Sequence, residues 1–166
     1  MIDAWIEWME TTRLSAAMLD SRWAWPLSEA VHFAGLVLLI GTVGLFDLRV
    51  LGLGRGIPPA AIHRLVKLGV LGFAFSAATG MLFVFGTPDQ YFYNAAFRWK
   101  LAFLGLMGAN VGFFYAVPYR GLASLGSHDE APRSAKACAA LSLTLLVAVM
   151  LCGRMLTFFR PIAGGF

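Results

Sequence analysis

Residues 27–46 read LSEAVHFAGLVLLIGTVGLF. This apolar run is long enough to cross the hydrocarbon core of a bilayer, because a transmembrane α-helix needs about 20 residues. Three further runs of this kind follow at 65–85, 97–117 and 137–158. Their hydrophobic residues are continuous instead of alternating, which disfavours the strands of a transmembrane barrel. The sequence therefore predicts an all-α polytopic membrane protein, built as a four-transmembrane-helix bundle.

The composition agrees with a protein whose solvent is lipid. Of the 166 residues, 59% are hydrophobic and 13% are charged, whereas a soluble domain has about 45–50% and about 25%. So few charges cannot cover a water-soluble globule, which argues against a soluble enzyme, a disordered chain or a disulfide scaffold. The length predicts a single domain over residues 1–166. The net charge of +4 comes from scattered basic residues, so no nucleic-acid partner is expected.

Residues 1–22 form a different kind of segment. Apolar side chains recur there at helical spacing between charged ones, which is typical of an amphipathic N-terminal helix lying in the membrane interface. The segment has no basic start and no small-residue cleavage site, so it does not resemble a cleaved signal peptide. A helix that packs over the end of the bundle fits the pattern equally well. The apolar residues that define the segment are Ile2, Trp5, Ile6, Met9 and Met18.

The distribution of Lys and Arg predicts the orientation, since cytoplasmic loops carry an excess of both. The loops after the first and third runs hold seven, namely Arg49, Arg55, Arg64, Lys67, Arg120, Arg133 and Lys136. The other side holds six, namely Arg13, Arg22, Arg98, Lys100, Arg154 and Arg160. Without Arg98, Lys100 and Arg154, which we expect inside the bundle, the second count falls to three. We therefore expect a bacterial cytoplasmic (inner) membrane protein with both termini in the periplasm.

Ionisable groups inside spans are costly and usually functional. Glu29 and His32 open the first run, three residues apart and therefore on one helical face. His32 is a candidate metal or haem ligand, with Glu29 as the partner of its second ring nitrogen. A histidine that hydrogen-bonds between helices, or one that handles protons, fits the same position.

Three basic residues are expected at the same end of the bundle, because alternate helices run in opposite directions. Arg98 and Lys100 open the third run, and Arg154 lies near the end of the fourth. Lys100 and Arg154 are candidates for pairing with an acidic group of a bound cofactor, such as a haem propionate. Arg98 fits that role and also the simpler one of extending its charge to the interface.

Polar residues also lie at the opposite end. His63 precedes the second run and is either a second metal ligand or an ordinary loop residue. His63 and His32 fall at opposite ends of their runs, so a ligand role for His63 requires a second haem. Asp47 and Arg49, at the exit of the first run, are interpreted as a local ion pair.

Small residues at a spacing of four mark where membrane helices usually touch. One set lies in the second run and a shorter set in the third. We expect both runs to make close helix contacts through these residues, and we expect such faces to favour a homo-oligomer. The residues are Gly72, Ser76 and Gly80 in the second run, and Gly108 and Gly112 in the third.

Three short motifs between residues 27 and 117 carry a family resemblance. They are EAVHFAG at 29–35, GMLF at 80–83 and FRWK at 97–100. Together they resemble a bacterial membrane protein family of the DUF2214/DUF6644 type and, more distantly, HemJ-type protoporphyrinogen oxidases and CopD-type membrane proteins. The resemblance to the HemJ-type enzymes implies a b-type haem held by His32 and a functional lysine at Lys100.

The first hypothesis is therefore an integral membrane protein that binds non-covalent haem b, in one or two copies, for electron transfer or redox chemistry. Its partners would be the lipid bilayer and a quinone or a periplasmic redox protein. Copper or small-solute transport, a HemJ-like oxidase activity and a cofactor-free assembly subunit are the alternatives.

Overall fold

The computed structural model describes residues 2–159, apart from the side chain of Ala123. These residues form α-helices with short connections, and no strand occurs among them. The long helices among them are α3 (Ala24–Leu51), α5 (Val66–Gly86), α7 (Ala95–Ala116) and α9 (Arg133–Met155). The shorter ones are α1 (Ile2–Glu10), α2 (Arg13–Asp20), α4 (Pro59–His63), α6 (Pro88–Phe92) and α8 (Tyr119–Ala123). Arg160, counted above on the outer side, lies outside the described residues.

Within residues 2–159, three helical segments are long and apolar enough to cross a membrane, namely Ala24–Leu51, Pro59–Gly86 and Arg133–Met155. The second of these comprises α4 and α5. The 22-residue α7 is not among the three, and its apolar sequence is interrupted by Arg98, Lys100 and Asn110. The predicted all-α fold is thus confirmed, together with three helices that could span a membrane.

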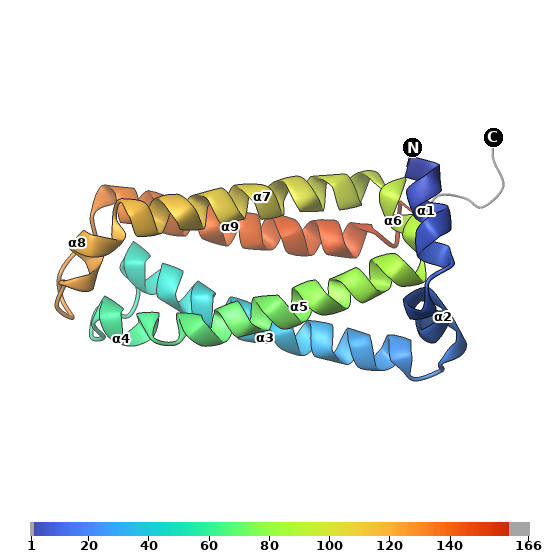
Figure 1. Ribbon diagram of the computed structural model, residues 1–166. Coiled ribbons are helices and arrows are strands. Elements are labelled where there is room, and N and C mark those ends of the chain that lie inside the picture. The colour runs from blue at the N-terminus through green and yellow to red at the C-terminus, as the bar shows by residue number, and fades with distance from the viewer. Residues whose placement is uncertain (1, 160–166) are drawn as a thin grey trace.

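The long helices pack as two antiparallel pairs (Figure 1). α3 lies along α5, α7 lies along α9, and the pairs are joined where α3 meets α9. Small residues let the first pair approach closely, since a Cβ on Gly35 would lie 2.5 Å from the carbonyl oxygen of Gly72. The contact expected for the second run is thus confirmed. The contact expected for the third run is wrong, because a Cβ on Gly108 or Gly112 would meet nothing within 4 Å.

The bundle is packed most closely at the end where α3 finishes and α9 begins. A cluster of buried hydrophobic side chains lies there, and it includes Phe46, Phe114 and Ala135. Apolar burial of this kind contributes roughly 25 cal/mol per Å² where it removes surface from water. The cluster also holds the loops on either side of α4 and α8 in place, because Leu122 of α8 and Ala131 of the following loop belong to it.

Arg49 fastens two loops at this same end. Its side chain is 2% exposed, and its guanidinium donates to the carbonyl oxygens of Ile57 and Ser127. The bond to Ser127 is 2.7 Å long. Within the described part of the chain, Arg49 forms no ion pair with Asp47. The predicted local pair is therefore wrong, because two loop carbonyls have taken up the arginine.

The N-terminal segment consists of two helices instead of the single helix predicted over residues 1–22. The chain turns at Thr12, whose Oγ1 accepts a hydrogen bond from the backbone N–H of Ser15 and so caps α2. α2 packs on α5, α1 contacts α5 and α6, and both helices lie across the end where α3 begins (Figure 1). The Tyr93 hydroxyl donates to the Asp3 carboxylate and lowers the pKa of that carboxyl. This segment packs over the end of the bundle, as one of the two interpretations expected.

Candidate functional site

His32 lies on α3, on the side that packs against α5, and more than one helical turn after the start of α3. Its side chain is half-buried. The ring centroid lies 5.6 Å from that of Phe83 on α5. A Cβ on Gly80 would lie 3.7 Å from Cε1 of the ring, so the glycine leaves space for the imidazole. The Ser76 hydroxyl on α5 also donates to the backbone carbonyl of His32, over 3.1 Å.

The hydrogen bonds of Thr79 let us assign the proton of the His32 ring. Thr79 is 6% exposed, and its Oγ1 lies 2.9 Å from Nδ1 of His32. The same hydroxyl lies 2.7 Å from the carbonyl oxygen of Phe75, which can only accept. A hydroxyl has one proton to donate, so Thr79 donates to Phe75 and accepts from Nδ1–H.

The imidazole is therefore held in the Nδ1–H form, and its lone pair lies on Nε2. No hydrogen bond joins Nε2 to any of residues 2–159. This is the arrangement found in metal-binding histidines, in which one nitrogen binds the metal while the other is fixed by a hydrogen bond. The sequence identified His32 but missed Thr79, because a threonine inside an apolar helix looks like an ordinary small packing residue.

Lys100, at the start of α7, reaches the same end of the bundle. Its side chain is half-buried, and Nζ would lie 3.8 Å from a Cβ placed on Gly153 of α9. Among the described residues, the ammonium forms no hydrogen bond or ion pair. A cationic group without a carboxylate partner in a half-buried position is suited to an anionic ligand.

The remaining predicted residues of this site lie at its edge. Glu29, Arg98 and Arg154 are exposed, and none forms an ion pair within residues 2–159. Glu29 is not the partner of Nδ1 of His32, since Thr79 holds that position. The structure thus places His32 and Lys100 half-buried at the same end of the bundle and leaves the other three exposed there.

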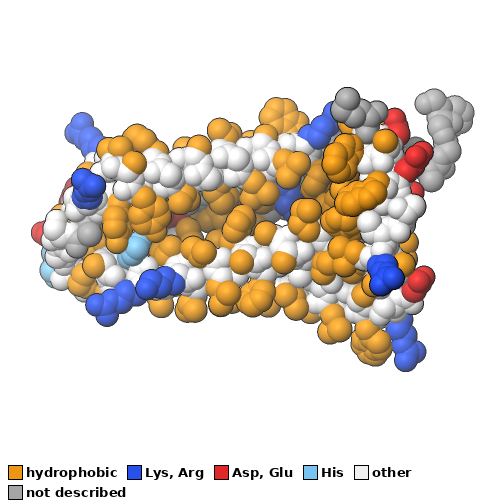
Figure 2. Space-filling model, in the orientation of Figure 1, with side chains coloured by type: hydrophobic (Ala, Val, Ile, Leu, Met, Phe, Trp, Pro, Cys, Tyr) orange, Lys and Arg blue, Asp and Glu red, His pale blue; other side chains and the backbone are white. Residues whose placement is uncertain are grey.

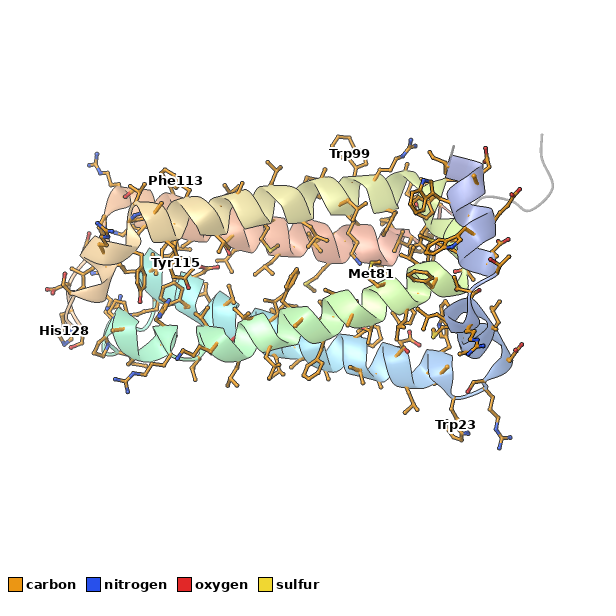
Figure 3. The ribbon with its side chains drawn as sticks, viewed as in Figure 1. Trp23, Met81, Trp99, Phe113, Tyr115 and His128 are labelled. Carbon is orange, nitrogen blue, oxygen red and sulfur yellow. The ribbon has the colours of Figure 1, made fainter. Side chains whose placement is uncertain are left out.

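His63 lies at the opposite end, among aromatic side chains. Its Nε2 lies 3.0 Å from the Tyr115 hydroxyl, and its Nδ1 lies 3.4 Å from the Tyr119 hydroxyl. Tyr115 points from α7 toward α4, whereas Phe113 points away from the bundle (Figure 3). The ring also packs edge-on against Phe46, at a centroid distance of 5.3 Å. Both nitrogens have hydroxyl partners, which favours the role of joining helices over that of a metal ligand.

The fold and the site define a class of protein, an all-helical chain with at least three potential membrane spans and one oriented imidazole. Within residues 2–159, no group of three or more His, Cys, Asp or Glu side chains could together hold a metal ion. No protein-family model matches the chain, and no curated protein or solved structure is significantly similar to it. The geometry around His32 and Lys100 is therefore what supports a functional proposal.

Proposed function

We propose that this chain is a multi-pass membrane protein that binds a b-type haem through His32 and serves electron transfer or redox chemistry. The observation that carries the proposal is the 2.9 Å contact between Nδ1 of His32 and Oγ1 of Thr79, together with an Nε2 that has no hydrogen-bond partner among residues 2–159. Iron in haem proteins is commonly held by one proximal histidine. The site therefore needs a single well-oriented imidazole, and it does not need a cluster of ligands.

The proposal includes α7 as a fourth span. Its 22 residues have a length of about 33 Å at about 1.5 Å per residue, and a bilayer core is about 30 Å thick. α7 also packs along α9, which is one of the three potential spans. Four spans put both chain termini on one side of the membrane, and the Lys and Arg count favours the periplasmic side of a bacterial inner membrane.

The basic residues at this end fit the acidic groups of a haem. Lys100 has no anionic partner among the described residues and lies near His32. Arg98 and Arg154 are exposed at the same end and are available for a second propionate. When bound, the haem would supply one-electron redox chemistry, which is tuned by its axial ligand and by nearby charge. The protein's own part is to orient the imidazole and to provide the cations.

The expectations of a second haem, a homo-oligomer and a redox partner have less support. A second haem at His63 is not part of the proposal, because both ring nitrogens already face tyrosine hydroxyls. A homo-oligomer stays part of the proposal, through the exposed surface of α7 around Gly112, whose Cβ position has no neighbour within 4 Å. A quinone or a periplasmic redox protein stays the proposed partner, and lipid is the proposed solvent of the long helices.

The absorption spectrum of the purified protein tests the proposal. Detergent-solubilised protein loaded with haem should show a Soret band, and His32→Ala should abolish it. His128→Ala is the matched control, because it removes an exposed loop histidine and should leave the band unchanged.

The other outcomes decide between the alternatives. A Soret band of full strength in His32→Ala, or no band in wild-type protein that has been incubated with haem and freed of unbound haem, would overturn the proposal. Colourless protein that binds Cu(I) would favour copper transport, and colourless protein that co-purifies with a subunit would favour an assembly role. Haem-dependent oxidation of protoporphyrinogen would show that the chain is a HemJ-like enzyme.

A further inference from the structure

A second site lies between the four long helices, toward the end opposite to His32. It is a cavity of about 290 Å³ lined by α3, α5, α7 and α9. Most of its wall is aliphatic or aromatic, with Phe73 and Phe114 among the rings. Polar atoms come mainly from Asp47, Asn110 and Ser142. His32 and Asp47 are 15 residues apart on α3, about 22 Å along a helix, so the cavity is separate from the imidazole site.

Asp47 is the unexplained group in this cavity. Its side chain is 5% exposed, and its Oδ2 is fully buried without a hydrogen-bond partner among the described residues. Arg49, the nearest basic residue in sequence, donates to Ile57 and Ser127 instead. Buried polar atoms in native proteins are nearly always paired, because an unpaired one costs about 1–3 kcal/mol.

Neighbouring polar side chains do not supply the missing partner. The amide of Asn110 donates over 3.0 Å to the backbone carbonyl of Cys138, so it serves the contact between α7 and α9. The Ser142 hydroxyl interacts with the Asp47 carboxyl, but Oδ2 remains without a donor. The Asp47 carboxyl thus borders a mostly apolar cavity, and one of its oxygens has no hydrogen-bond partner among the described residues.

The cavity can be reached from the side. α5 and α7 both line it, yet they do not pack on each other. The surface is hollowed between the two helix pairs, and hydrophobic side chains line the hollow (Figure 2). In a bilayer this side faces acyl chains, so a molecule dissolved in the membrane can enter without crossing water.

Volume and chemistry define the ligand. A dry cavity of about 150 Å³ accepts benzene, so 290 Å³ suits one substituted ring with part of a tail. Aromatic walls favour an aromatic ring, and a hydroxyl on that ring can pair with the Asp47 carboxyl. We propose that this cavity binds a lipid-soluble phenol or quinol, whose hydroxyl pairs with the Asp47 carboxyl while its alkyl tail leaves between α5 and α7.

Two probes of nearly equal shape test the hydroxyl. 4-Hexylphenol and its methyl ether, 4-hexylanisole, differ only in whether they can donate a hydrogen bond. Each is titrated by equilibrium dialysis against the protein in nanodiscs, with empty nanodiscs subtracted to remove partition into lipid. We expect saturable binding of one phenol per chain and at least tenfold weaker binding of the anisole. Equal binding of the two probes would overturn the proposal.

Three variants test the location. Gly108→Leu points a side chain into the cavity from a position whose Cβ meets no atom within 4 Å, and it should abolish saturable binding. Gly112→Leu is the matched control on the same helix. It also meets nothing within 4 Å and does not line the cavity, so binding should be unchanged. Asp47→Leu should weaken phenol binding about tenfold and leave anisole binding unchanged.

The variants remain informative even if one of them fails to fold. Gly108→Leu binding like wild type, or Gly112→Leu losing binding equally, would place the phenol elsewhere and overturn the proposal. If Asp47→Leu does not fold, the comparison of phenol with anisole in the wild type still decides the role of the hydroxyl. The proposal does not depend on haem, so loss of the Soret band in His32→Ala leaves these titrations unaffected.

Discussion

Nδ1 of His32 on α3 lies 2.9 Å from Oγ1 of Thr79 on α5, and the threonine's own proton is directed to the carbonyl of Phe75. The pair therefore fixes both the tautomer and the rotation of an imidazole inside a potential span. Because each partner comes from a different helix, the bond also ties the imidazole to the extensive contact between α3 and α5.

Thr79→Val tests Thr79 as a positioning residue. Valine keeps the shape and removes the acceptor, so the imidazole loses the bond that holds it in the Nδ1–H form. Loss of such a partner typically costs 10–100-fold in metal affinity, and we expect haem affinity to fall by about that factor. Haem titration followed by the Soret band measures it, and the reduction potential should also shift.

Thr79→Ser is the matched control, because serine retains the hydroxyl and should restore affinity to within a few-fold of wild type. A purely structural role for Thr79 predicts a different result. In that case Thr79→Val would lower thermal stability while haem affinity and potential stayed unchanged.

The contact between α3 and α5 depends on the absence of side chains at Gly35 and Gly72. A Cβ on either residue would lie 2.5 Å from a backbone carbonyl oxygen of the other helix. The backbone cannot easily move to relieve such a contact. We expect Gly72→Ala to destabilise the fold by about 1–3 kcal/mol, as overpacking does. Gly41→Ala on α3 meets nothing within 4 Å, so it should stabilise by up to about 1 kcal/mol through helix propensity. Thermal unfolding in detergent compares the two, and equal destabilisation would contradict the packing argument.

Asp47 should lower the stability of the ligand-free protein. Its buried Oδ2 has no partner among residues 2–159, so Asp47→Leu removes an unsatisfied group and adds apolar surface to the cavity wall. We expect the variant to be more stable by about 1–3 kcal/mol. Asp20→Asn changes an exposed carboxylate and should stay within about 0.5 kcal/mol of wild type. A clear loss of stability in Asp47→Leu would mean that the carboxyl has a structural role.

The comparison of sequence with structure shows which features local pattern can predict. Long apolar runs predict helices, because the length of a run and its lack of alternation are local properties. His32 stands out as a candidate residue for a similar reason, since a lone imidazole in an apolar run is unusual. Its partner Thr79 was not foreseen, because it lies 47 residues away and resembles a packing residue.

Features that depend on tertiary neighbours escaped prediction. Arg49 was assigned to Asp47, but its acceptors belong to loops 8 and 78 residues away. Gly108 was expected at a helix contact, and it faces a cavity instead. In both cases the sequence shows only the type of residue. What that residue contacts depends on how the two helix pairs pack together.

Acid should weaken the link between the loops at the Arg49 end of the bundle. Glu130 lies 3.2 Å from Nζ of Lys136 and 3.1 Å from the Arg55 guanidinium. Lys136 first, and then Arg55, lower the pKa of this carboxyl below its ordinary value of 4.5. A lowered pKa means that the pair stabilises the fold fully above the ordinary value, and that this contribution is lost as the pH falls through the lowered one.

Glu130→Gln should therefore reduce the unfolding temperature slightly at neutral pH, and the difference should vanish in strong acid and shrink in about 1 M salt. Glu10→Gln, an exposed carboxylate outside any ion pair of the described residues, should show no such pattern, and a Glu130→Gln difference that persists in acid would contradict the assignment.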